Sequence, residues 1–148
     1  TFCAVATRDS RTRHPRHQQQ DPTTMPDQSP TNPLTTLLNT TSAKDPGRAC
    51  FLLHVRPEAL EEYVDVHQRV WAEMRDALTT AGWRHYSLFL NPDTGLVVGY
   101  FESDDTAAAM EAMADTDVNT RWQAEMQRYF VQPDGGTPTL LQQYFYLP

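Results

Sequence analysis

The hydrophobic positions in the second two-thirds of the chain follow two different periods. A continuous apolar run at residues 49–55 (ACFLLHV) has the length of a buried strand. From Glu58 onward apolar residues recur at every third or fourth position, which predicts one helix that ends at Gly82. The apolar face of this helix consists of Leu60, Tyr63, Val64, His67, Val70, Trp71, Met74, Leu78 and Ala81. The opposite face, which we expect to be solvated, consists of Glu61, Glu62, Asp65, Gln68, Arg75, Asp76 and Thr79.

The rest of the pattern adds a hairpin, two helical segments and a last strand. The expected elements are strands at 83–90 and 96–102, helices at about 104–113 and 117–129, and a strand at 140–147. Alternation places Trp83 and Tyr86 on opposite faces of their strand. The order β-α-β-β-α-β is the ferredoxin-like arrangement of the α+β class, with helices on one face of an antiparallel sheet. A second copy of the chain is the simplest cover for the other face, which predicts a homodimer that forms a dimeric α/β barrel.

Residues 1–48 differ in composition from residues 49–148. They are rich in Pro, Ser and Thr and include a run of three glutamines at 18–20. Such a segment buries too little apolar surface to offset the entropy lost on ordering. We therefore expect a disordered polar tail at 1–48 and one folded domain at 49–148.

The charge of the chain excludes several classes of partner. Lys and Arg number 12 against 19 Asp and Glu, which gives a net charge of −7, and most of the acidic residues lie in the expected domain. A nucleic-acid surface needs a basic footprint, and an anionic membrane is equally disfavoured. A neutral small molecule fits this charge better. No secretion signal or membrane span is recognisable, so we expect a cytosolic protein.

His67 is the strongest candidate for chemistry. Helical spacing aligns it with Tyr63 and Trp71 on one face, and an imidazole titrates near neutral pH. Tyr86 from the next strand and Trp122 from the last helix could complete a pocket, in which the indole would stack on a sugar face. A structural role is the alternative at each position, either as a histidine bonded to a backbone carbonyl or as an aromatic side chain in the core.

Neither a metal nor a cofactor is indicated by the sequence. His54, His67 and His85 come from three different expected elements and lack the spacing of a metal-binding pair. Cys3 and Cys50 form no zinc or redox motif. The fingerprints of nucleotide binding and of nucleophilic hydrolases are missing from the sequence. We therefore expect a site made of side chains alone.

Four motifs resemble those of the L-rhamnose mutarotase family, in the same order and spread over residues 49–148. They are EYxxxHxxVWxE at 62–73, GxxxYSLFL at 82–90, DTDVxxRW at 115–122 and the terminal FYLP at 145–148. One departure lies at Ala72, where a proline often follows the helix tryptophan in that family. We expect this difference to be structural only.

The resemblance implies a dimeric α/β barrel isomerase that interconverts the α and β anomers of L-rhamnose without a cofactor. It implies that His67 donates a proton and that Tyr63, Tyr86 and Trp122 bind the sugar. Gln123 stands where the best-known members of the family carry a second tryptophan. We expect Gln123 to contact the sugar, and the amide leaves open whether the preferred aldose is L-rhamnose or a close relative.

Two rival functions stay open at the level of sequence. Another cofactor-free dimeric α/β barrel enzyme, such as a monooxygenase or a lactone isomerase, would also place a His or Tyr in an apolar pocket. A small-sugar binding module would bind its ligand without accelerating anomer exchange. Such a module has no need of a group that titrates near neutral pH.

Overall fold

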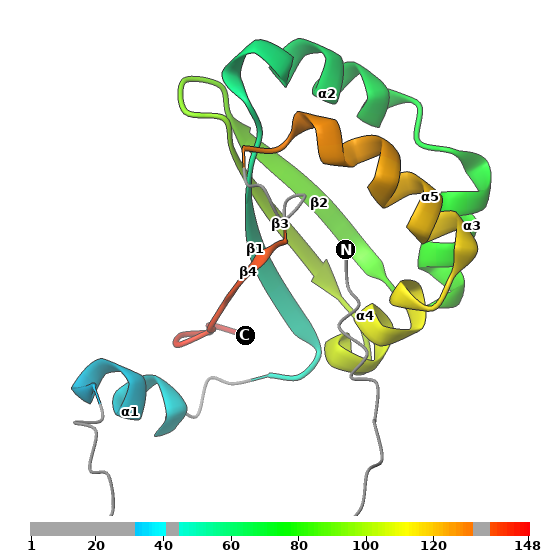
Figure 1. Ribbon diagram of the computed structural model, residues 1–148. Helices are drawn as coiled ribbons and strands as arrows, with labels where there is room; N and C mark the ends of the chain where they lie inside the picture. The colour runs from blue at the N-terminus through cyan, green and yellow to red at the C-terminus, as the bar shows by residue number, and fades with distance from the viewer. Residues whose placement is uncertain (1–31, 41–44, 132–136) are drawn as a thin grey trace, which may run out of the picture.

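One four-stranded sheet with helices on a single face organises the protein, as the computed structural model shows (Figure 1). The structure describes residues 32–40, 45–131 and 137–148. The strands are β1 (Arg48–His54), β2 (Arg84–Asn91), β3 (Leu96–Glu102) and β4 (Thr139–Leu141). They are ordered β2-β3-β1-β4, and all neighbours are antiparallel.

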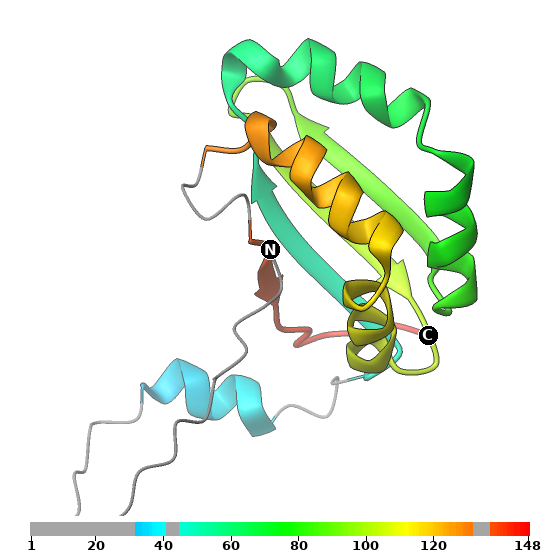
Figure 2. The same cartoon turned by 45° about the vertical axis from the view of Figure 1, so that its right-hand side comes forward.

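Each of the two helical connections is divided into two helices. The helices are α2 (Leu60–Gln68), α3 (Ala72–Thr80), α4 (Thr106–Ala114) and α5 (Asp117–Met126), with single 3-10 turns η1 (Pro57–Ala59) and η2 (Gln127–Tyr129). Figures 1 and 2 show α2 to α5 on the same side of the sheet. The order of strands and helices confirms the predicted ferredoxin-like α+β fold.

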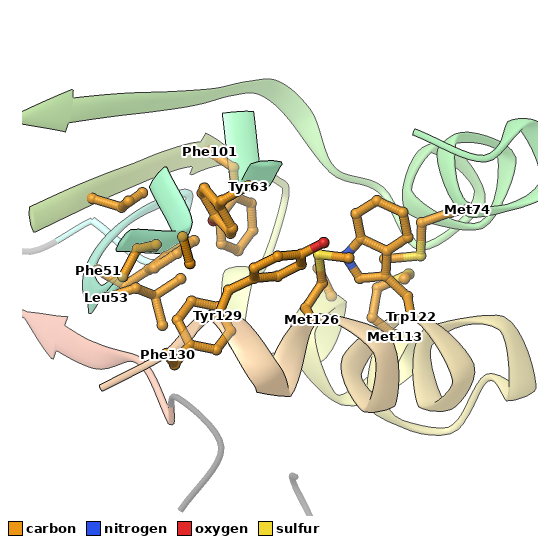
Figure 3. Close-up of a cluster of buried hydrophobic side chains, with 14 residues drawn as sticks. Phe51, Leu53, Tyr63, Met74, Phe101, Met113, Trp122, Met126, Tyr129 and Phe130 are labelled. Atoms are coloured by element: carbon orange, nitrogen blue, oxygen red, sulfur yellow. The ribbon is translucent and has the colours of Figure 1, made fainter. Parts of the chain in front are cut away.

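The core lies between the sheet and these helices. Phe51 and Leu53 of β1 point to the helix side because they alternate with residues that face away. Figure 3 shows these two residues at one end of the buried cluster and Trp122 at the other, beside Met74 and Met113. On the helix face predicted to be apolar, Tyr63 and Met74 are buried and most other hydrophobic residues are partly buried against the core. Val64 is 39% exposed, so its expected place on that face is wrong.

The predicted single helix at 58–81 is wrong in one respect, because it is interrupted between Gln68 and Ala72. Arg69 leaves the helical conformation with φ −130° and ψ 42°. Trp71 is extended, with φ −50° and ψ 139°, and it precedes the first residue of α3. The apolar period continues across the break, so the pattern alone does not reveal it. The consequence is a change of direction between α2 and α3, which is visible in Figure 2.

The predicted alternation in β2 is also wrong at its start. Arg84 pairs with Glu102 and Ser87 pairs with Tyr100, so β2 contains one extra residue there, and His85 adopts a positive φ of 52°. Such a bulge shifts the following side chains to the other face. The ring of Trp83 consequently lies 4.9 Å from that of Tyr86 on the helix side.

The two ends of the chain differ from the sequence predictions as well. The last strand, expected at 140–147, is limited to β4, and residues 142–148 form no strand. The helix α1 (Pro33–Thr40) lies in the segment expected to be disordered, although none of its residues is buried. Residues 1–31 and 41–44 of the predicted tail lie outside the described residues. Within the described ranges, no helix has the length and hydropathy needed to cross a membrane.

Candidate active site

A cavity of about 430 Å³ lies between the sheet and the helices. This volume is within the range of roughly 300–1,000 Å³ that is typical of sites for small molecules. All five residues that the sequence assigned to the site line it, namely Tyr63, His67, Tyr86, Trp122 and Gln123. They come from α2, β2 and α5, so the fold brings together side chains that are far apart in the sequence.

His67 is held in one tautomer by its own helix. Its Nδ1 atom lies 2.8 Å from the backbone carbonyl oxygen of Tyr63. A carbonyl can only accept, so Nδ1 carries the proton and Nε2 keeps its lone pair in the neutral ring. Partial burial lowers the pKa of His67 below 6.5, and the bond to the Tyr63 carbonyl opposes that shift only in part. The ring is therefore neutral at pH 7 and can accept a proton at Nε2.

Two phenols share the cavity with this imidazole. Burial raises the pKa of Tyr63 far above its usual value, and the charge that Tyr86 would carry raises it further. Burial raises the pKa of Tyr86 to about 12, although 40% of the residue is exposed. Tyr86 also borders the cavity. Both hydroxyls therefore stay protonated near neutral pH and can donate hydrogen bonds to a ligand.

Trp122 connects the imidazole to the wall of the cavity. Its indole meets the ring of His67 edge-on, with centroids 5.5 Å apart, and only 6% of the residue is exposed. The ring of Trp71 packs against Trp122 from another side at 5.1 Å. Trp71 does not line the cavity, which corrects the expectation that it shares a pocket face with Tyr63 and His67. The break before α3 turns Trp71 into a support for Trp122.

Three polar residues of the cavity were missed by the sequence analysis. Gln68 and Arg75, which the helical period assigned to the solvated face, are exposed and also border the cavity. Asn119 lines it from α5 and accepts a hydrogen bond from Nε2 of Gln123 at 3.3 Å. The spacing of Asn119, Trp122 and Gln123 at three and four residues would have identified Asn119 as part of the same helix face.

The histidines considered as metal ligands are not gathered in one place. His54 is exposed at the end of β1, and His85 is exposed at the bulge of β2. Among the residues that the structure describes, no group of three or more His, Cys, Asp or Glu is arranged to hold a metal ion.

Comparison with known proteins places this architecture in a family. A family model for L-rhamnose mutarotase matches residues 48–147. The L-rhamnose mutarotases of Tolumonas auensis and Bacillus subtilis are each 34% identical over 102 residues, which cover 68% of this chain and 97% of theirs. The crystal structure of an L-rhamnose mutarotase from Formosa agariphila has the same fold, with a TM-score of 0.59 and 20% identity over 68% of this chain and 98% of that one. The chain belongs to the L-rhamnose mutarotase family.

Proposed function

We propose that this protein interconverts the α and β anomers of L-rhamnose or a closely related aldose. Membership of the family supports the reaction class. The observation that carries the proposal is a neutral imidazole with a fixed tautomer that borders a cavity together with two protonated phenols. These are the groups that acid–base opening of a sugar ring requires.

His67 can perform both proton transfers of ring opening. Its Nε2 atom takes the proton from the anomeric hydroxyl, the oxygen electron pair forms the aldehyde, and the bond from C1 to the ring oxygen breaks. The imidazolium then gives its proton to the ring oxygen. Rotation about the bond between C1 and C2, followed by the reverse transfers, closes the ring as the other anomer. The low pKa of His67 favours this order, because the imidazolium donates readily once it has formed.

The remaining side chains hold the sugar in place. The hydroxyls of Tyr63 and Tyr86 donate hydrogen bonds to sugar oxygens, and their high pKa values make them poor general acids but reliable donors. The indole of Trp122 packs against an apolar face of the sugar, beside the imidazole that it contacts. Gln123 contributes an amide to the same wall. Fixing the anomeric carbon against His67 supplies the orientation that a proton shuttle needs.

Exchange between anomers tests the proposal directly. NMR exchange spectroscopy of L-rhamnose measures the rate at which the two anomeric signals interconvert with and without the protein. We expect the wild type to accelerate exchange and His67→Ala to lose about 10²–10⁴-fold of that acceleration. His54→Ala is the matched control, because His54 is exposed and does not border the cavity. Undiminished exchange in His67→Ala would refute the proposed role of this residue. A wild type that binds the sugar without accelerating exchange would favour a sugar-binding module.

We further propose that the catalytic unit spans residues 49–148 and works as a homodimer. The face of the sheet away from the helices carries an apolar row across three strands, in which Leu52 pairs with Val98 and Val98 pairs with Phe89. Phe89 is 62% exposed. Burying this row against a second copy of the chain would stabilise both copies through the hydrophobic effect. The cytosolic location expected from the sequence stays a prediction.

A further inference from the structure

Among the residues that the structure describes, Arg75 is the only arginine that forms no ion pair. Each of the others pairs with an aspartate or a glutamate, and these are Arg48, Arg56, Arg69, Arg84, Arg121 and Arg128. Glu73, two residues before Arg75 in α3, accepts a hydrogen bond from Arg121 at 2.8 Å instead. In a chain with 19 acidic residues against 12 basic ones, an unpaired guanidinium is an exception. Its N–H groups stay available for a ligand.

The unpaired guanidinium belongs to the cavity, although the helical period placed Arg75 on the solvated face. The break between Gln68 and Ala72 redirects α3 relative to α2 (Figure 2). Met74 and Leu78 of α3 line the cavity together with Arg75. Leu78 is one helical turn from both of the other two, so the three side chains share one side of α3. Because Arg75 is also exposed to solvent, it lies at the rim of the cavity.

A guanidinium at this rim suits a ligand with neighbouring hydroxyl groups. Among the described residues around the cavity, only Arg75 carries a planar fork of N–H groups on separate nitrogen atoms. The phenols of Tyr63 and Tyr86 each offer a single O–H donor. Two adjacent hydroxyls on a sugar ring present their oxygen atoms side by side, so both arms of the fork can donate at once. A guanidinium never accepts, and it stays charged at any pH at which the protein is folded.

We propose that Arg75 is a further substrate-binding residue, whose guanidinium donates hydrogen bonds to two adjacent, non-reacting hydroxyls of the aldose. This inference rests on the proposed function and adds a binding residue to the same site. On binding, the sugar replaces the water around the guanidinium with two charge-assisted hydrogen bonds. The hydroxyls concerned take no part in ring opening, so these bonds are equally strong before and during the reaction. They therefore lower KM and leave kcat unchanged.

Substitution of Arg75 tests this contact without removing a bond that the described part of the protein makes. In Arg75→Met we expect KM for L-rhamnose to rise about tenfold, with kcat as in the wild type. Arg75→Lys keeps the charge and loses the fork, so its KM should lie between the two. Arg69→Met is the matched control, because Arg69 is exposed, pairs with Asp65 and does not border the cavity. An unchanged KM in Arg75→Met would overturn the inference.

Deoxy analogues of L-rhamnose identify the two hydroxyls. Sugars that lack the hydroxyl on C2, C3 or C4 each lose one acceptor and keep the anomeric centre. Two adjacent hydroxyls among these three must include the one on C3. We therefore expect Arg75→Met to raise KM less with the 3-deoxy sugar and with one of the other two, and to raise it fully with the third. An equal rise with all three sugars, or a smaller rise with only one, would overturn the inference.

Binding to the His67→Ala protein separates this inference from the proposed function. Titration calorimetry with L-rhamnose measures recognition without catalysis, and adding Arg75→Met to that variant should weaken binding by the same factor of about ten. Failure of the wild type to accelerate exchange would overturn the proposed function, while a loss of affinity on removal of Arg75 would still support the contact. Accelerated exchange in the wild type, with equal affinities of the two variants, would overturn the inference alone. Thermal melting shows that each variant is folded.

Discussion

Nδ1 of His67 lies 2.8 Å from the carbonyl oxygen of Tyr63, one turn earlier in the same helix. In many sites a carboxylate orients a catalytic histidine and raises its basicity. Here a neutral carbonyl fixes the tautomer and leaves the pKa of His67 below its ordinary value. The imidazole thus serves as a weak base whose conjugate acid gives up its proton easily, which suits a shuttle between two oxygens of one substrate.

Activity should rise with pH through the pKa of His67, which lies below the ordinary histidine value of 6.5. Above that pKa, activity should stay level through neutral pH. Only the neutral ring accepts the anomeric proton, so protonation at lower pH removes activity. The phenols impose no loss on the alkaline side until far higher pH, because the pKa of Tyr86 is about 12. The profile of kcat/KM against pH measures both limbs. A midpoint above 6.5 would contradict the burial effect on His67.

The lowered pKa of His67 also determines how this residue makes the stability of the protein depend on pH. Because the folded state holds the proton of His67 less tightly than the unfolded chain, its contribution to stability is present above pH 6.5 and is lost as the pH falls through the folded pKa. The difference between wild type and His67→Ala in chemical unfolding, measured on either side of that range, isolates this contribution.

Tyr63→Phe should lower kcat/KM about fivefold while preserving the fold. The ring of Tyr63 packs edge-on against Tyr129 and Phe130, at centroid distances of 5.8 Å and 5.9 Å, and phenylalanine keeps both contacts. Among the described residues the Tyr63 hydroxyl has no hydrogen-bond partner, so its removal costs the free protein little. The substitution would remove one hydrogen bond to the sugar, which contributes around 1 kcal/mol. Exchange kinetics combined with urea unfolding test both halves of this expectation.

The sequence predicts the direction of a side chain where that residue lies inside a regular helix or strand. It does not do so where the helix or strand is interrupted. Tyr63 and His67 lie one turn apart inside α2, and their shared orientation follows from helical spacing. Trp71 was assigned to the same face, but the helix ends before it, and its contact with Trp122 is a long-range event that no local period contains.

The strand that carries Tyr86 gives a similar lesson. Its motif located the residue correctly, yet the bulge at His85 decides which face it occupies. Histidine is among the residues that adopt a positive φ more readily than most, and the pairing with β3 on both sides of the bulge is invisible in the sequence. Asn119 was overlooked for a different reason, since an amide in a helix is usually solvated and its bond to Gln123 needs coordinates to be seen.

Phe89→Glu should convert the proposed homodimer to monomers. Phe89 is 62% exposed on the face of the sheet away from the helices and lies beside Val98, so a carboxylate there would have to be buried in a dimer. In the monomer the same change is at the surface and should alter stability by less than about 0.5 kcal/mol. Sedimentation velocity of the two proteins at equal concentration gives the answer. Asp93→Asn, a change in the exposed β2–β3 turn, serves as the control for altered charge. A wild type that sediments as a monomer would refute the dimer itself.

Ala72→Pro should stabilise the protein by about 0.4–1 kcal/mol. Ala72 is the first residue of α3, where a helix has no use for the backbone N–H, and that N–H makes no hydrogen bond with the described residues. Trp71 already has the extended ψ of 139° that a following proline demands. Proline would therefore restrict the unfolded chain without straining the native turn.

The control for this substitution is Ala77→Pro, in the middle of the same helix. There the ring would break a helical hydrogen bond and clash with the preceding turn, so a loss of about 3 kcal/mol or more is expected. Urea unfolding followed by circular dichroism compares the three proteins. If Ala72→Pro were destabilising by a similar amount, α2 and α3 would have to form one continuous helix in solution. The bend that turns Trp71 toward Trp122 would then be absent, and with it the support for the wall of the cavity.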